Sequence, residues 1–134
     1  MRKLIGVTFI LFMLILQLCA SPALADEASG TIYEELYGNN KLTLDSTGVL
    51  YISGVGEMAS FSLPWNIVKM IEKIIIEEGI TSISDSAFEG FTNVSAVIIA
   101  DTVKSIGNSA FALCKKLSKI EIPKNVSTIG GGAF

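Results

Sequence analysis

The side chains that could do acid–base or nucleophilic chemistry are two pairs of adjacent glutamates and one cysteine. Glu34-Glu35 and Glu77-Glu78 are the carboxylate pairs, and Cys114 is the cysteine that lies beyond residue 25. Glycoside hydrolysis needs two carboxylates that flank one bond, roughly 5–9.5 Å apart. Neighbours along a strand point to opposite faces of a sheet. We therefore interpret both pairs as solvated charge, and neither predicts a hydrolase.

Several residue types that catalysis and metal binding use are absent from residues 26–134. This part of the sequence has no His, no Arg and one Cys. Nucleophile pairs that need His, multi-Cys or His metal sites and Arg forks for phosphate are excluded within it. We interpret Cys114 as a buried, unreactive thiol, because Lys115 should point outward and no other cation is placed to lower its pKa. The sequence predicts no enzyme, no cofactor and no metal site.

The segment before Asp26 has the three parts of a secretory signal peptide. Arg2 and Lys3 precede an apolar run, Leu4 to Leu18, and Ala23-Leu24-Ala25 offers a small-residue cleavage site. The run is shorter than the roughly 20 residues that a membrane-spanning helix needs. We predict cleavage after Ala25, a secreted or cell-surface location and no membrane span afterwards. A lipidated Cys19 is the alternative, although the small residue that usually precedes such a cysteine is missing.

The remaining chain is acidic. Without Arg2 and Lys3, the ten basic residues become eight lysines against 13 acidic residues, so the net charge changes from −3 to −5. Binding to nucleic acid needs a clustered basic surface. No nucleic-acid partner is therefore expected.

The chain repeats itself at a fixed step along the sequence. Three Ala-Phe pairs follow this step, at Ala87-Phe88, Ala110-Phe111 and Ala133-Phe134. Five further apolar registers repeat with it: Ile71/Val94/Leu117, Ile74/Val97/Ile120, Ile76/Ile99/Ile122, Ile80/Val103/Val126 and Ile83/Ile106/Ile129. The period, about 23 residues, lies within the range of leucine-rich repeats, roughly 20–29.

Each repeat is expected to hold one strand and one short helical turn. Lys119-Ile120-Glu121-Ile122 alternates between polar and apolar residues, which is typical of a strand with one wet face. Stacked copies would form a parallel sheet, and each Ala-Phe pair would open a helical turn whose Phe fills the interior. The predicted fold class is α/β, a leucine-rich-repeat solenoid. Its predicted interior comprises Trp65, Ile74, Ile76, Phe88, Phe91, Val97, Ile99, Phe111, Cys114, Ile120 and Ile122.

A leader, residues 26–70, precedes the repeats. Lys41–Leu44 and Val49–Ile52 flank a turn signal, and they predict a β-hairpin that caps the solenoid. Trp65 lies one period before Phe88. We therefore interpret it as part of a degenerate half repeat, with its ring in the core; stacking against a ligand is the alternative. Residues 26 to about 37 are mostly polar and are expected to be loose.

The repeat segment, residues 71–134, contains two complete repeats and an incomplete third. The third copy begins near Leu117 and stops at Phe134, which should be buried. Either the chain is a piece of a longer array or another molecule covers this end, so self-association through the uncapped third repeat is one expectation. Gly107 and Gly130 share their register with Ser84, so a positive φ is not required there.

The pattern Ile-x-Ile-Pro-x-x-Val-x-x-Ile-Gly-x-x-Ala-Phe resembles the BspA-like leucine-rich repeat family. Residues 120–134 fit every fixed position, residues 97–114 have Ala100 in place of Pro, and residues 74–91 depart at three positions. The resemblance implies a secreted or surface protein, and several members are described as binding host matrix proteins or other cells. The family has no fixed catalytic or binding residues, so none is carried over. Its members are usually much longer than this chain.

The outward residues of the predicted sheet form the candidate binding face. They are Lys73, Ile75, Glu77, Ala96, Ile98, Lys119 and Glu121. Ile75 and Ile98 should lie side by side and face water, and an exposed apolar patch edged by charge can bind a protein partner. The alternative is that β-branched residues simply suit strands.

We predict an adhesin-type module that binds a protein, for example a host matrix or cell-surface protein. One alternative is a module that binds carbohydrate or cell wall. Such a module would use exposed aromatic residues, whereas Tyr33, Tyr37 and Tyr51 are expected in the leader and not on the sheet. The other alternative is an inactive fragment of a longer surface protein.

Overall fold

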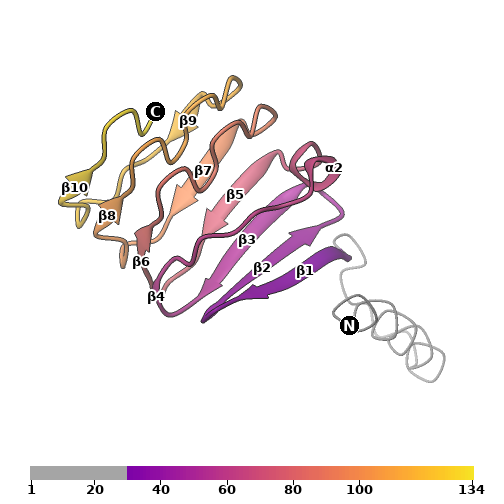
Figure 1. The fold of residues 1–134 in the computed structure, drawn as a ribbon, viewed down its shortest axis with the longest axis horizontal. Helices are drawn as coiled ribbons and strands as arrows, with labels where there is room; N and C mark the ends of the chain where they lie inside the picture. The colour runs from indigo at the N-terminus through magenta and orange to yellow at the C-terminus, as the bar shows by residue number, and fades with distance from the viewer. Residues whose placement is uncertain (1–29) are drawn as a thin grey trace.

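The computed structural model describes residues 30–134, which wind into a solenoid of stacked coils (Figure 1). The signal peptide with cleavage after Ala25, and the alternative lipidation of Cys19, lie outside the described residues. Residues 49–70, 71–93, 94–116 and 117–134 form successive coils, each with a strand in each of two sheets. Among residues 30–134, no helix has the length and apolar character needed to cross a membrane.

The larger sheet has six strands in the order β1-β2-β3-β5-β7-β9. These strands are β1 (Thr31–Tyr37), β2 (Asn40–Asp45), β3 (Val49–Gly54), β5 (Lys73–Ile76), β7 (Ala96–Ile99) and β9 (Lys119–Ile120). β1, β2 and β3 pair antiparallel, and β3, β5, β7 and β9 pair parallel. The predicted solenoid, with one parallel strand per repeat in this sheet and an N-terminal hairpin, is confirmed.

The pairing register of the parallel strands equals the sequence period. Ile75 of β5 lies opposite Ile98 of β7, and Ala96 of β7 lies opposite Lys119 of β9. The two members of each pair are one repeat period apart in the sequence. Equivalent side chains therefore point to the same side of the sheet in every coil.

The smaller sheet was not predicted. Its four strands are β4 (Gly56–Glu57), β6 (Ile80–Ile83), β8 (Ser105–Ile106) and β10 (Thr128–Ile129), in the order β10-β8-β6-β4, all parallel. Its inward residues, such as Ile80 and Ile83, are three positions apart, so they show no polar–apolar alternation. A strand as short as two residues is also too short to produce a periodic signal.

The third side of each coil consists of tight turns instead of the expected helical turn. Residues 85–90 and 108–113 are turns, and Ser86 and Ser109 both adopt a φ of 52°. Backbone hydrogen bonds join this side from coil to coil: the Phe88 N–H donates to the Ala110 carbonyl, and the Phe111 N–H to the Ala133 carbonyl, each at 2.8 Å. In the first coil the helix α2 (Trp65–Val68), a single turn, takes this place.

The interior consists of aliphatic rows and a stack of aromatic rings. Phe88 and Phe111 are fully buried, with ring centroids 5.3 Å apart and planes at 16°. Phe111 stacks on Phe134 at 5.7 Å. The predicted interior residues that are buried are Ile74, Ile76, Phe88, Phe91, Val97, Ile99 and Phe111.

Trp65 is not in this core, contrary to our expectation. Its side chain is 58% exposed, and Phe61 takes the place next to Phe88, with ring centroids 5.6 Å apart. Tyr37 follows Phe61 at 5.8 Å, and both contacts of the Phe61 ring are tilted, at 52° with Tyr37 and 57° with Phe88. The first coil departs from the 23-residue frame, since its aromatic core residue lies four positions earlier. Trp65 is left at the start of α2, on the surface.

The last coil buries its inward side chains less completely than the 23-residue period predicts. Ile122 was predicted to be inside, but it is 40% exposed and lies beyond β9, whose pairing with β7 ends at Ile120. Ile120 and Cys114 are half-buried and pack against the core cluster. Among the described residues this coil has a neighbour on one side only, so its inward side chains contact protein on fewer sides.

The leader is more ordered than its polar composition indicated. Residues 31–37 were expected to be loose, but they form β1, which pairs with β2. The inward leucines of β2, Leu42 and Leu44, are fully buried. The hairpin turn is fixed by the buried Asp45, whose carboxylate accepts from the N–H groups of Thr47 at 2.8 Å and Val49 at 3.0 Å.

Candidate binding face

The outer face of the six-stranded sheet carries the predicted binding residues. Lys73 and Ile75 lie in β5, Ala96 and Ile98 in β7, and Lys119 in β9. Glu77 and Glu121 follow closely after β5 and β9, and both are exposed. The structure therefore brings the seven residues together along neighbouring strands of one sheet.

An apolar row crosses the middle of this face. Tyr51 of β3 lies opposite Ile75 of β5, and Ile75 lies opposite Ile98 of β7. Since adjacent strands are about 4.8 Å apart, the three side chains form one continuous strip. Ile98 is 49% exposed, while Ile75 and Tyr51 are half-buried. We call Tyr51, Ile75 and Ile98 the apolar strip.

Tyr51 is the member that our sequence analysis missed. We treated the hairpin as a cover for the end of the solenoid, but β3 pairs in parallel with β5 and extends the repeat sheet. The alternation of inward Leu50 and Ile52 with outward Tyr51 matches that of Ile74, Ile76 and Ile75. That shared parity is the signal that could have placed an aromatic ring on this face.

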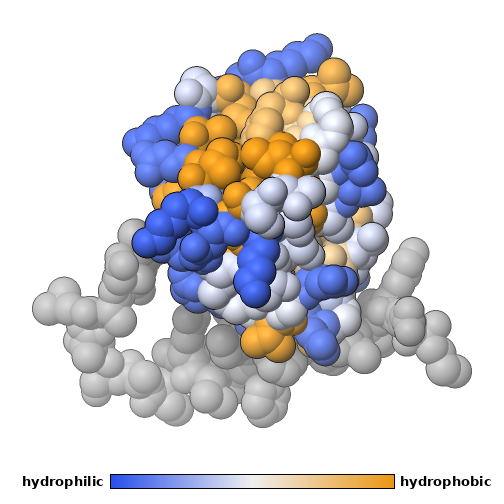
Figure 2. Space-filling model, turned by 90° about the vertical axis from the view of Figure 1, so that its left-hand side faces the viewer, coloured by the Kyte–Doolittle hydropathy of each residue, from blue (hydrophilic) through white to orange (hydrophobic). Residues whose placement is uncertain are grey.

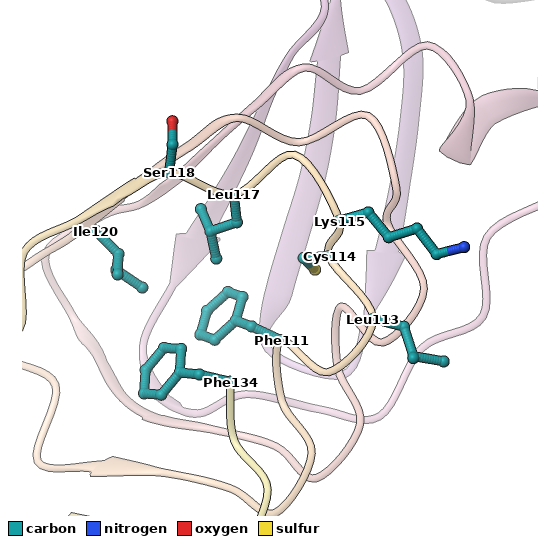
Figure 3. A pocket seen from close by; sticks show the side chains of 8 residues that line it. All are labelled: Phe111, Leu113, Cys114, Lys115, Leu117, Ser118, Ile120 and Phe134. Carbon is teal, nitrogen blue, oxygen red and sulfur yellow. The ribbon is translucent and has the colours of Figure 1, made fainter.

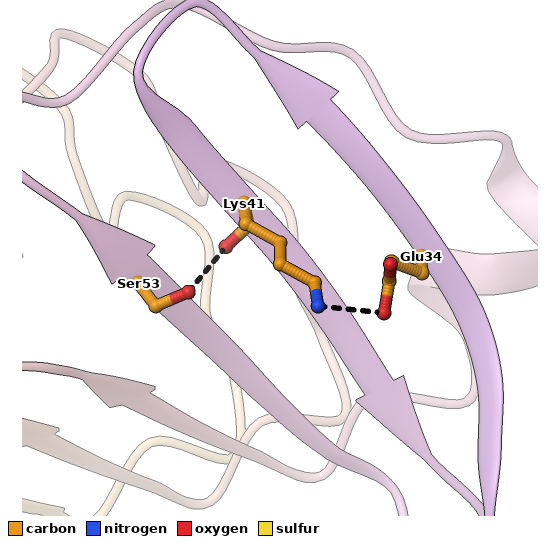
Figure 4. A network of polar contacts seen from close by, with 3 residues as sticks. All are labelled: Glu34, Lys41 and Ser53. Carbon is orange, nitrogen blue, oxygen red and sulfur yellow. Dashed lines mark hydrogen bonds and ion pairs between the residues drawn. The ribbon is translucent and has the colours of Figure 1, made fainter.

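Charged and polar groups border the strip. On one side, the neighbouring row consists of Val49, Lys73, Ala96 and Lys119, in which two lysines alternate with two apolar residues. Toward β1, the Lys41 ammonium lies 2.9 Å from the Glu34 carboxylate, and the Ser53 hydroxyl donates to the Lys41 carbonyl at 3.4 Å (Figure 4). An exposed ion pair contributes only about 0–1 kcal/mol, so its main effect is to make this border polar.

The Tyr51 phenol is a neutral hydrogen-bond donor at neutral pH. Burial raises the pKa of Tyr51, and the carboxylates of Asp45 and Glu77 raise it further. A ring with one neutral polar end beside two isoleucines is the kind of amphipathic group that protein interfaces favour.

The Glu34-Glu35 pair is split between environments, as the strand parity predicted, whereas Glu77 and Glu78 lie after β5 and are both exposed. Glu34 faces outward with Thr43, whereas Glu35 shares the inner face with Leu42 and accepts hydrogen bonds from the hydroxyls of Tyr33 and Tyr37. The described residues contain no group of three His, Cys, Asp or Glu side chains that could hold a metal ion.

A second apolar area lies on the end of the last coil. Side chains there line a hollow of about 310 Å³, in which Phe111, Leu117, Ile120 and Phe134 converge (Figure 3). Cys114 lies in the same wall, and its thiol donates to the Phe88 carbonyl at 3.1 Å. Burial raises the pKa of Cys114, so the thiol is protonated at neutral pH and a poor nucleophile.

A third apolar area lies on the side that carries the smaller sheet. Figure 2 looks at this side and shows apolar side chains gathered in one region, with hydrophilic ones on either side. Ile129 of β10 belongs to this sheet and is 50% exposed, almost the same fraction as Ile98. Exposure alone therefore does not single out the outer face of the larger sheet.

Residues 65–134, more than half of the chain, match the family model described as the BspA-type leucine-rich repeat region. The chain belongs to the BspA-type leucine-rich repeat family. The match covers α2 and the three coils after it, so family membership and the stacked strands describe the same part of the molecule. A leucine-rich repeat domain of this family is a non-catalytic fold.

Three solved structures of leucine-rich repeat proteins are similar to this chain, and the first of them also supports the family assignment. A leucine-rich repeat protein from Eubacterium ventriosum is 34% identical, with a TM-score of 0.66, over 77% of this chain and 28% of that one. A leucine-rich cell surface protein from Faecalibacterium prausnitzii is 21% identical, with a TM-score of 0.46, over 78% and 34%. The leucine-rich repeat protein of T. pallidum is 18% identical, with a TM-score of 0.44, over 72% and 42%.

The BspA-type chain thus spans between 28% and 42% of the lengths of these solved proteins. No curated protein matches it. Family membership accounts for the fold and leaves the partner to be inferred from the surface of this chain.

Proposed function

We propose that this BspA-type chain is an exported binding module that attaches to a protein partner through the outer face of its six-stranded sheet. The apolar strip carries the proposal. Tyr51, Ile75 and Ile98 form one uninterrupted row on a flat, hydrogen-bonded surface, with charged residues on its borders. An apolar centre with a polar rim is the usual composition of a protein–protein contact.

The rigidity of this face supports the proposal. Every strand that carries the strip is paired on both sides within the sheet. The inner neighbours Leu50, Ile74 and Val97 are buried in the core. A partner would therefore meet a preorganised surface, and little conformational entropy would be lost on binding.

Export is the second part of the proposal. It is supported by Arg2 and Lys3 before the apolar run and by the cleavage site at Ala25. Amino-terminal sequencing of protein recovered from the cell surface or the medium should begin at Asp26. A mature protein that begins at Met1 would contradict export, and one that begins at Cys19 would contradict cleavage after Ala25.

The binding face is tested with Ile98→Lys. A panel of purified matrix proteins, such as fibronectin, laminin, fibrinogen and collagen, is immobilised, and binding of the wild-type protein is measured by surface plasmon resonance. The substitution puts a charge in the middle of the apolar strip, so we expect affinity for the bound matrix protein to fall at least about tenfold.

Ile129→Lys is the matched control. Ile129 is the same residue type with almost the same exposure, but it lies in the smaller sheet. We expect this variant to bind like the wild type. Equal loss in both variants, or unchanged binding of a folded Ile98→Lys protein, would overturn the choice of face.

A further inference from the structure

Trp65 lies in the first coil, which departs from the repeat frame. Phe61 has taken the core position beside Phe88, and the larger Trp65 ring is 58% exposed at the start of α2. It is the single tryptophan of the chain. The ring therefore does not fill the core, and its exposed part can contact a ligand.

The ring borders a hollow between the first two coils. The hollow measures about 270 Å³ and lies between α2 with its preceding segment and the tight turn at residues 85–90. Its apolar lining includes the buried side chains of Val68, Ala87 and Phe91. Its exposed polar lining consists of Ser62, Ser86 and Glu89.

Both sides of the hollow are held in place. The Lys69 ammonium lies over the Trp65 ring, 5.2 Å from its centroid, and covers one face of it. The Lys69 N–H also donates to the Trp65 carbonyl at 3.2 Å. On the opposite side, the Ser86 N–H donates to the Asn108 carbonyl at 2.8 Å, which ties this turn to the next coil. A ligand would therefore meet groups that are already ordered.

The chemistry of this lining selects among ligands. Ser62, Ser86 and Glu89 offer exposed hydrogen-bonding groups that a wholly apolar ligand would not use. Nucleic acid and other polyanions are disfavoured by Glu89 and by the net negative charge of the chain. A neutral sugar satisfies both halves of the site, because the apolar C–H groups of a pyranose ring can cover an indole and its hydroxyls can donate to the carboxylate and the serines.

We propose that Trp65, Ser86 and Glu89 form a carbohydrate subsite that accepts one neutral pyranose unit of a longer glycan. The volume is below the roughly 300–1,000 Å³ typical of sites for drug-sized molecules. One sugar ring therefore lies in the hollow, and the rest of the glycan continues over the surface. None of these residues belongs to the six-stranded sheet, so the subsite is independent of the protein-binding face.

The test uses the fluorescence of Trp65, which reports on this site alone because the chain has no other tryptophan. Trisaccharides of glucose, galactose, mannose and N-acetylglucosamine are added to the full chain up to about 10 mM, the range of a weak single-ring site. We expect at least one of them to shift the emission saturably and to protect Trp65 from quenching by acrylamide. Failure of all four sugars to do either would overturn the proposal.

Isothermal titration with variants then assigns the contacts. We expect the affinity for the active trisaccharide to fall at least about tenfold in Trp65→Ala, and to fall measurably in Glu89→Gln and in Ser86→Gly. Ser86→Gly removes the hydroxyl and retains a residue that tolerates the φ of 52°. Because Trp65 is exposed, Trp65→Ala should melt like the wild type, and unchanged sugar affinity in that folded variant would overturn the proposal.

Tyr51→Ala separates this subsite from the protein-binding face. We expect it to retain sugar binding, since Tyr51 lies in β3 on the outer sheet face. Conversely, Trp65→Ala should retain binding to the matrix protein that Ile98→Lys disrupts. Sugar binding that is lost in Tyr51→Ala and retained in Trp65→Ala would place the sugar on the sheet and contradict the subsite.

Discussion

The leader and the repeat segment build the same solenoid with different residues. In residues 71–134 the aromatic residues are Phe88, Phe91, Phe111 and Phe134, whereas the leader contains all three tyrosines and the only tryptophan. The repeats place their Phe rings in one stack at a fixed spacing along the sequence. The leader extends this row of rings with Phe61 and Tyr37, which lie out of the 23-residue frame and make tilted contacts instead of stacked ones.

The difference shows what strict repetition contributes and what it prevents. A fixed period makes every coil present the same side chains to the next one, which fills the core but yields a uniform surface. The leader is released from this constraint, so it can place a polar-tipped ring, Tyr51, on the sheet and a large ring, Trp65, beside a hollow. Both proposed binding regions therefore depend on leader residues.

The largest predicted difference between the two segments is in stability, when one aromatic ring is removed from each. Phe111 is buried between Phe88 and Phe134, so Phe111→Ala should cost about 3–5 kcal/mol of unfolding free energy. Trp65→Ala removes a larger but exposed ring and should cost less than about 1 kcal/mol. Urea denaturation followed by circular dichroism measures both values. Similar losses in the two variants would contradict the assignment of Phe111 to the core and Trp65 to the surface.

A smaller effect is expected where two coils touch. A Cβ added at Gly107 would lie 2.5–2.7 Å from atoms of Asp85 and Ser84 in the preceding coil, so Gly107→Ala should cost about 1–3 kcal/mol. Gly131→Ala is the matched control, because its Cβ would lie 3.7 Å from the Asn108 side chain. It should be neutral or slightly stabilising. Thermal melting of both variants checks this, and a Gly107→Ala protein as stable as Gly131→Ala would show that the coils can separate at no cost.

These glycines also show which parts of the fold the sequence could predict. The shared register of Gly107, Gly130 and Ser84 indicated that no positive φ was needed, and the structure gives neither glycine one. The reason for glycine at Gly107 and Gly130 is the close approach of two backbones, which is a contact between coils. Sequence periodicity reports which side chains are equivalent, but it contains no distance between neighbouring coils.

The same reasoning explains which sequence predictions were correct and which were wrong. The parallel sheet and its register were predictable, because stacking forces the pairing offset to equal the 23-residue period. The prediction for Trp65 was wrong because we extended the 23-residue period into the first coil, which does not follow it. The prediction for Ile122 was wrong because this residue lies beyond the last strand pairing. On the candidate face, β5, β7 and β9 were predictable from parity. Parity also places Tyr51 on the outward side of its strand, but no repeat shows that this strand joins the sheet beside β5.

The smallest predicted effect is a loss of stability at alkaline pH that should begin in the leader and not in the repeat segment. Desolvation and the neighbouring Glu35 carboxylate raise the pKa of Tyr33 and of Tyr37 above the ordinary value. Their protonated form is therefore favoured in the folded state, and this stabilisation is fully present below the unfolded-state pKa of about 10 and is lost progressively as the pH rises above it. The repeat segment has no tyrosine, so the loss should start in the leader.

We therefore expect the wild-type melting temperature to fall between pH 9.5 and 11, by roughly the few degrees that about 1 kcal/mol produces. The double variant Tyr33→Phe/Tyr37→Phe should fall less over the same range, because it has lost the groups that titrate beside Glu35. Because the pKa of Tyr51 is also raised, Tyr51→Phe should reduce the fall as well, while the general effect of alkaline pH on lysines is common to the wild type and both variants. Hydrogen exchange at pH 10.5 should show β1 and β2 opening before β5 and β7. If all four strands opened together, the leader and the repeats would form one cooperative unit despite their different residues.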